Sequence, residues 1–146
     1  MKRPGFTLIE LLLVIGIIAI LASIVIVAIN PTKQIGDARD VTRRGDINEI
    51  LNKVYEYAVD HNGTLPECIT TTARNICVTG SACAGITDGC DLDALTGSYL
   101  PTVPTDPQYS AGTDGNDTGY DVLKDANGRV TVSAKGEQTA TISVTR

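Results

Sequence analysis

The chain has 146 residues, enough for one small domain with appendages. Its formal net charge is −5, and with five Tyr, one Phe and no Trp its core must be packed mainly by aliphatic side chains. The sequence shows no basic stripe for phosphates, so we expect no nucleic acid as a partner of its globular head.

The N-terminus carries the strongest pattern. Residues 6–29 are almost continuously apolar, and a helix of these 24 residues would be about 36 Å long, enough to cross a bilayer core of about 30 Å. Lys2 and Arg3 precede this segment, so we expect a cytoplasmic N-terminus and export of the rest. A secretory signal peptide would have a shorter apolar run. A plain membrane anchor would not explain Glu10, a carboxylate within the apolar span.

The first twelve residues, MKRPGFTLIELL, resemble the class III leader junction of type IV pilins and type II secretion pseudopilins. The resemblance covers about the first thirty residues. It implies that residues 1–5 are a leader, which a prepilin peptidase removes after Gly5, and that the new N-terminal residue Phe6 is N-methylated. Gly5 suits the cleavage site because a residue without a side chain lets a protease approach the backbone closely.

The resemblance also implies a role for Glu10 in assembly. Opposite charges attract much more strongly at low dielectric than in water. The Phe6 amine of an incoming subunit would therefore pair with Glu10 of a neighbour and set the axial register. The alternative is that Glu10 reaches out to the membrane interface. Implied partners are further copies in a helical filament, an inner-membrane assembly platform and an assembly ATPase. The implied location is a single-pass inner-membrane protein before assembly and an extracytoplasmic or cell-surface filament afterwards.

Residues 6–30 are predicted to form a transmembrane and assembly helix, and residues 31–63 an amphipathic stem helix. Pro31 interrupts the pattern, which predicts either a kink in one long helix or a new helix capped by Asn30. Apolar residues at helical spacing predict the face that packs on the head. These residues are Ile35, Ala38, Val41, Ile47, Ile50, Leu51, Val54 and Ala58.

Residues 64–118 are predicted to be an irregular region rich in Cys and Pro. Its four cysteines, Cys68, Cys77, Cys83 and Cys90, are typical of two disulfides in an exported protein. Sequential pairing, Cys68–Cys77 and Cys83–Cys90, is the first choice, and the two other pairings stay open. Zinc is a competing reading, although no C-x-x-C spacing is present. Residues 99–107 resemble the Pro-rich loop of major pseudopilins.

Residues 119–146 are predicted to form an antiparallel sheet of three strands, at 119–124, 129–134 and 139–145. The turn between the first two contains Asn127-Gly128, a strong hairpin signal. The expected fold class is α+β: a long N-terminal helix, half transmembrane and half amphipathic, packed on this small C-terminal sheet, with a disulfide-stapled loop region.

Two weaker kinds of site fall in the same region. Calcium prefers several oxygen ligands on a flexible loop, and major pseudopilins carry calcium near the equivalent place. The candidate ligands here are Asp114, Asn116, Asp117 and Asp121. No other cofactor is expected. Asn62-Gly63-Thr64 and Asn116-Asp117-Thr118 are N-x-T sequons, each with an Asp two residues before its Asn.

The sequence predicts no enzyme. His61 is the only histidine, and neither G-x-S-x-G nor H-E-x-x-H occurs. The first functional hypothesis is a structural subunit of a type IV pilus-like filament. The alternatives are a pseudopilin of a type II secretion system and a membrane-anchored binding module that does not polymerise.

Overall fold

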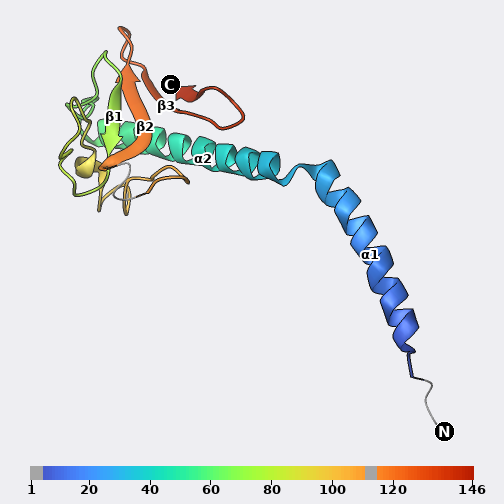
Figure 1. The fold of residues 1–146 in the computed structure, drawn as a ribbon. Helices are drawn as coiled ribbons and strands as arrows, with labels where there is room; N and C mark the ends of the chain where they lie inside the picture. Colours follow the sequence, from blue (N-terminus) through green and yellow to red (C-terminus); the bar gives the residue numbers. More distant parts are fainter. Residues whose placement is uncertain (1–4, 111–114) are drawn as a thin grey trace. The chain divides into compact units, whose positions relative to one another are not determined.

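The computed structural model describes residues 5–110 and 115–146 (Figure 1). The helices are α1 (Leu8–Ile29), α2 (Pro31–Asp60) and a short 3-10 helix η1 (Asp93–Leu95). The strands are β1 (Arg74–Cys77), β2 (Asp117–Lys124), β3 (Val130–Ala134) and β4 (Ile142–Thr145). The chain forms two compact units, 1–36 and 37–146, and each is described by itself. We call the second unit the head.

A new helix begins at the Asn-Pro pair. Asn30 has left-handed backbone angles, with φ of 43°. Its side-chain Oδ1 accepts a hydrogen bond from the backbone N–H of Lys33 at 3.4 Å, and its carbonyl also accepts one from Lys33. Pro31 occupies the first helical position, where its missing N–H removes no helical hydrogen bond. Of the two predicted outcomes, the structure therefore shows the second, with Asn30 as the N-cap of α2.

The amphipathic face of α2 is confirmed in its C-terminal part but wrong in its N-terminal part. Ile47 and the predicted positions after it, from Ile50 to Ala58, are buried, whereas Ile35 and Val41 are 53% and 64% exposed and Ala38 is exposed too. Val41 lies six residues before Ile47, which at about 100° per residue turns it about 120° from the buried face. The residues in phase with that face are Asp40 and Arg43, and both are buried.

The sheet is an antiparallel meander in the order β1-β2-β3-β4. The α+β class is confirmed, but the sheet has four strands rather than three. The prediction missed β1 because this strand has only four residues and pairs with β2, some forty residues further along the chain. The hairpin at residues 125–128 is confirmed: the N–H of Gly128 donates to the carbonyl of Asp125 at 3.0 Å, and Gly128 has a φ of 83°.

The hydrophobic core of the head lies between α2, the sheet and the long connection from β1 to β2. Burying an aliphatic side chain contributes about 1.5–3 kcal/mol, so this core provides the main driving force for folding. Tyr120 is fully buried, and its hydroxyl donates to Asp46 at 2.5 Å. The fully buried members are Ile47, Ile50, Leu51, Val54, Ile69, Ile76, Cys90, Leu95, Tyr120, Val122, Val130 and Val132.

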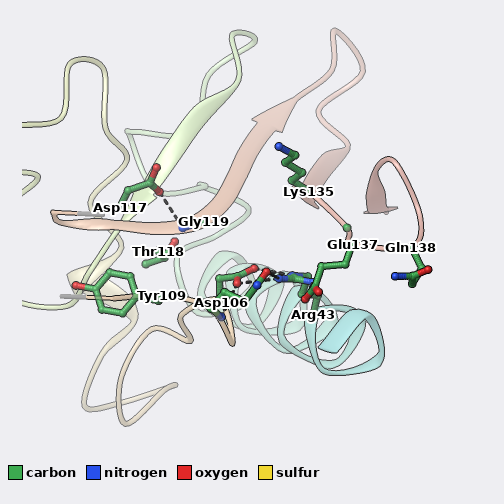
Figure 2. Close-up of a pocket in the computed structure, with 11 residues that line it drawn as sticks. Arg43, Asp106, Tyr109, Asp117, Thr118, Gly119, Lys135, Glu137 and Gln138 are labelled. Carbon is green, nitrogen blue, oxygen red and sulfur yellow. Dashed lines mark hydrogen bonds and ion pairs between the residues drawn. The ribbon is translucent and has the colours of Figure 1, made fainter. Parts of the chain in front are cut away.

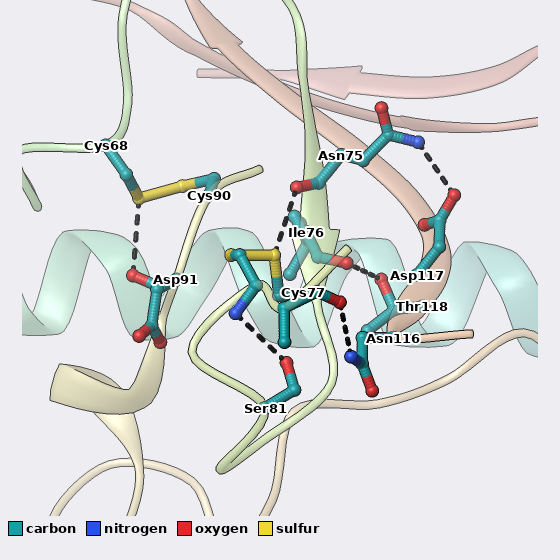
Figure 3. The surroundings of a disulfide bond; sticks show 12 residues. Cys68, Asn75, Ile76, Cys77, Ser81, Cys90, Asp91, Asn116, Asp117 and Thr118 are labelled. Atoms are coloured by element: carbon teal, nitrogen blue, oxygen red, sulfur yellow. Dashed lines mark hydrogen bonds between the residues drawn. A yellow bond between two sulfur atoms is a disulfide. The ribbon is translucent and has the colours of Figure 1, made fainter. Parts of the chain in front are cut away.

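All four cysteines form disulfides, but in a pairing other than the first choice. The bridges are Cys68–Cys90 and Cys77–Cys83 (Figure 3). The pairing follows from backbone hydrogen bonds between β1 and the segment at Cys90. The N–H of Cys90 donates to the carbonyl of Asn75 at 2.7 Å, and the N–H of Cys77 donates to the carbonyl of Cys90 at 3.0 Å. Cys77 and Cys90 thus lie on neighbouring backbone segments, and each bonds to a different partner.

Candidate functional site

The N-terminal processing segment is exposed. Gly5 lies before the first helix, with no atom near the position that a side chain would take, and Phe6 is 84% exposed. The helix begins only at Leu8. The Gly5–Phe6 bond therefore lies in irregular, accessible chain, as proteolysis requires.

Thr7 and Glu10 form a reciprocal cap at the start of α1. The side-chain oxygen Oε2 of Glu10 accepts hydrogen bonds from the backbone N–H of Thr7 at 2.8 Å and from its hydroxyl at 2.7 Å. In return, the Glu10 N–H donates to Thr7 Oγ1 at 3.3 Å. This capping box satisfies N–H groups that lack helical partners. It also fixes the carboxylate at the first turn, and within the described chain Glu10 makes no ion pair.

Helix α1 is long and apolar enough to cross a membrane. Its 22 residues correspond to about 33 Å, and its most apolar stretch has a mean hydropathy of 3.3. None of its residues is buried. A surface of this kind calls for lipid or other apolar helices around it.

Residues 1–26 match the family model of the prokaryotic N-terminal methylation motif. The chain carries the N-terminal motif of type IV pilin-like proteins. The match confirms the resemblance to a class III prepilin leader and, together with the apolar α1, indicates membrane anchoring. It ends within α1 and includes no part of the head. No curated protein and no solved structure matches the chain.

The calcium candidates are only partly described, because Asp114 lies outside the described residues. The Asn116 amide donates to the carbonyl of Ala84. Asp117 uses one oxygen to accept from Asn75 at 2.8 Å and the other to accept from the N–H of Gly119 at 2.9 Å. Within the described ranges, no three His, Cys, Asp or Glu side chains come together as a metal site. Calcium binding stays a prediction.

Burial, followed by the charge of Asp117, raises the pKa of the Asp121 carboxyl above its ordinary value. Asp121 lies on β2, where it pairs with Ser133 of β3. Burial in the sheet accounts for this direction without a cation, so it does not by itself indicate a metal site.

A buried arginine network was not foreseen from the sequence (Figure 2). Arg43 of α2 has a side chain only 2% exposed, and it forms a fork on Asp106, with Nε to Oδ2 at 2.6 Å and Nη2 to Oδ1 at 2.9 Å. Its Nη1 donates to Asp40 at 2.8 Å and to Glu137 at 3.2 Å. The fork joins α2 to the Pro-containing loop, the bond to Glu137 joins α2 to the connection between β3 and β4, and the bond to Asp40 lies within α2.

Asp40 is bound by three consecutive backbone N–H groups. Its carboxylate accepts hydrogen bonds from the N–H groups of Glu137, Gln138 and Thr139 at 2.8, 2.9 and 3.2 Å. These bonds, the one from Glu137 above all, outweigh burial and hold the pKa of Asp40 far below its ordinary value. Conversely, the bonds to Asp106 raise the pKa of Arg43, so it stays charged despite burial. We call Asp40, Arg43, Asp106 and Glu137 the polar lock.

Proposed function

We propose that the chain is a structural subunit of a type IV pilus-like filament. The observation that carries this proposal is the methylation motif at residues 1–26, joined to an α1 that buries none of its residues. In this role a prepilin peptidase cleaves the Gly5–Phe6 bond, the new Phe6 amine is methylated, and the chain contributes no catalytic step of its own.

Glu10 is the proposed register residue. Cleavage gives Phe6 a positive charge, and in apolar surroundings the carboxylate of a neighbouring copy is its best partner. The capping box supports this role because it engages Oε2 alone, so that Oε1 remains available to an incoming amine. A copy whose amine missed a carboxylate would leave both charges unpaired in an apolar interface, at a cost of several kcal/mol.

Before assembly, α1 holds the subunit in the inner membrane with its N-terminus in the cytoplasm. An assembly platform and an ATPase then move it into the growing filament, while the acidic head stays outside the membrane. The positive charges of Lys2 and Arg3, which precede α1, favour this orientation.

The processing step is tested by the intact mass of the protein purified from membranes. The expected mass lacks residues 1–5 and includes one added methyl group on Phe6. A Gly5→Leu variant is expected to keep its leader, because a side chain obstructs approach to the bond. A wild-type chain that keeps Met1, or one cut near Ala28, would rule out this maturation.

The register role is tested by Glu10→Gln, which keeps the size and hydrogen-bonding oxygen of the side chain but removes its charge. Filaments, measured by shearing and sedimentation, should be lost, while cleavage and membrane insertion remain normal. Ser23→Ala is the matched control within α1, since among the described residues the Ser23 hydroxyl bonds only to the carbonyl of Ile20, within its own helix. Normal filaments from Glu10→Gln would contradict the charge pairing, whereas a wild-type chain that is cleaved and inserted but forms no filaments would favour a non-polymerising membrane-anchored module.

A pseudopilin of a type II secretion system is the second candidate. It is favoured by the resemblance of residues 99–107 to a pseudopilin loop, and in the structure Asp106 of this loop is anchored on Arg43. Deleting the gene separates the two roles. Loss of surface filaments supports the pilus, whereas accumulation of exported proteins in the periplasm supports the secretion system.

A further inference from the structure

The structure presents the two N-x-T sequons of the head very differently. The first, at residues 62–64, lies in the turn that follows α2, and the second, at 116–118, leads into β2. We propose that Asn62 is an N-glycosylation acceptor of the folded head and that Asn116 is not. This modification goes beyond the filament role and does not depend on polymerisation.

Asn62 is accessible and its side chain is free. It is exposed and has a φ of 55°, a left-handed conformation that Asn tolerates well at a helix end. The N–H of Gly63 closes the helix by donating to the carbonyl of Ala58 at 2.7 Å. Thr64 is exposed as well. Within the described chain, neither the Asn62 amide nor the Thr64 hydroxyl makes a hydrogen bond, so both sequon groups are available to an enzyme.

The flanking chain also suits an acceptor. Residues 61–73 contain no helix or strand, so the backbone at the sequon can bend into a transferase without breaking a sheet. Asp60, two residues before Asn62, is exposed. An acidic residue at this place is a feature that some bacterial transferases require. Here it is the last residue of α2, and its Oδ2 accepts a hydrogen bond from the Tyr99 hydroxyl at 2.9 Å.

The second sequon is held inside the fold (Figure 3). The Asn116 amide nitrogen donates to the carbonyl of Ala84 at 2.5 Å. The Thr118 side chain is fully buried, and its hydroxyl donates to the carbonyl of Ile76 at 2.7 Å. A transferase would have to open the start of β2 to reach the Thr118 hydroxyl, and local opening of a paired central strand is rare. The Asn116 amide, which is half-buried and lies just before β2, would have to give up its bond to Ala84.

The reaction is a group transfer from a lipid pyrophosphate-linked oligosaccharide. The Asn62 side-chain nitrogen attacks the anomeric carbon of the first sugar, and a carbon–nitrogen bond forms there. The bond from that carbon to the pyrophosphate oxygen breaks, and the lipid pyrophosphate leaves with the bonding electrons. A base of the transferase takes the amide proton, so no oxidant or reductant is needed.

The test uses the oxidised full chain in detergent, a purified bacterial oligosaccharyltransferase that requires an acidic residue two before the Asn, and its lipid-linked oligosaccharide. Intact mass and peptide mapping should show one glycan, at Asn62, with occupancy at least about tenfold above Asn116, because the buried Thr118 hydroxyl of the second sequon is reached only by local opening. Asn62→Gln should abolish the shift, and Asn116→Gln should leave it unchanged.

Two controls separate acceptor geometry from loss of folding. Thr64→Val keeps the shape of an exposed side chain and leaves Asn62 in place, yet it should abolish the transfer because the hydroxyl is missing. Short synthetic peptides of both sequons should be modified to a similar extent, which would assign the difference in the full chain to the fold. An unmodified Asn62 in the folded chain, or equal occupancy at Asn116, would overturn the proposal.

Discussion

Replacing Arg43 by Met should remove most of the polar lock while keeping a side chain of similar length. Breaking a buried ion pair on one side costs about 3–5 kcal/mol because the remaining charge is left without its partner. The Asp106 and Glu137 side chains are 16% and 25% exposed, so water can reach them in part. Asp40 keeps its three backbone donors. We therefore expect a loss near the lower bound, about 3 kcal/mol.

Urea unfolding of the oxidised full chain in detergent, followed by the near-ultraviolet circular dichroism of tyrosine, measures this loss. About 3 kcal/mol lowers the unfolding midpoint by roughly 1–3 M urea. Arg44→Met is the matched control, because Arg44 is exposed and its contact with Thr139 is 3.4 Å long, and it should change stability by less than about 0.5 kcal/mol. Arg43→Lys, which keeps the charge without the fork, should fall between them. Equal midpoints for Arg43→Met and Arg44→Met would refute the reasoning.

Three further predictions follow from the same structure. The pKa of Asp40 is depressed in the folded state, so its charged form contributes stability above the ordinary carboxyl pKa of 3.8. This stability is lost as the pH falls through the folded-state pKa. Acid unfolding followed by circular dichroism should therefore be less steep in Asp40→Asn than in the wild type. Removing the Cys68–Cys90 bridge with paired Ala substitutions should cost about 3 kcal/mol and removing Cys77–Cys83 about 2, since the first closes the longer loop; equal costs in urea unfolding would argue against this account. Gly45→Ala should stabilise the helix by up to about 1 kcal/mol, because open space surrounds Gly45, whereas Gly136→Ala should destabilise the head in thermal unfolding, because its Cβ would lie 2.1 Å from the carbonyl oxygen of Thr139.

The parts of the fold that depend on local signals were predictable from the sequence. The almost continuously apolar composition of residues 6–29 predicts α1, and Asn127-Gly128 predicts the hairpin between β2 and β3, because each signal lies within the element that it describes. The exposure of Val41 could also have been predicted from the sequence, because Val41 lies six residues before Ile47 and therefore off the buried face of the helix.

Other features depend on distant pairings and carry no local signal. The disulfide pairing follows from β1, whose four residues show no clear alternation and are stabilised by β2 and by the segment at Cys90. The polar lock joins Arg43 to Asp106 and Glu137, which follow it by 63 and 94 residues. In a sequence, an arginine on an amphipathic helix is normally assigned to the solvent face. The one indication in the sequence that Arg43 is buried is its position four residues before Ile47, on the same face of the helix.

The contrast between the head and α1 explains why a single carboxylate matters for the proposed assembly. Every Leu, Ile and Val side chain of α1 is exposed, and keeping each of them out of water, in lipid or among other apolar helices, contributes about 1.5–3 kcal/mol, or tens of kcal/mol for the helix. Such burial is non-directional, since one apolar helix can slide along another with little change in buried area. It therefore gives α1 affinity for apolar surroundings but sets no axial register. Glu10 is the one charged side chain on α1, so the free energy of assembly depends on axial position chiefly through its pairing with Phe6.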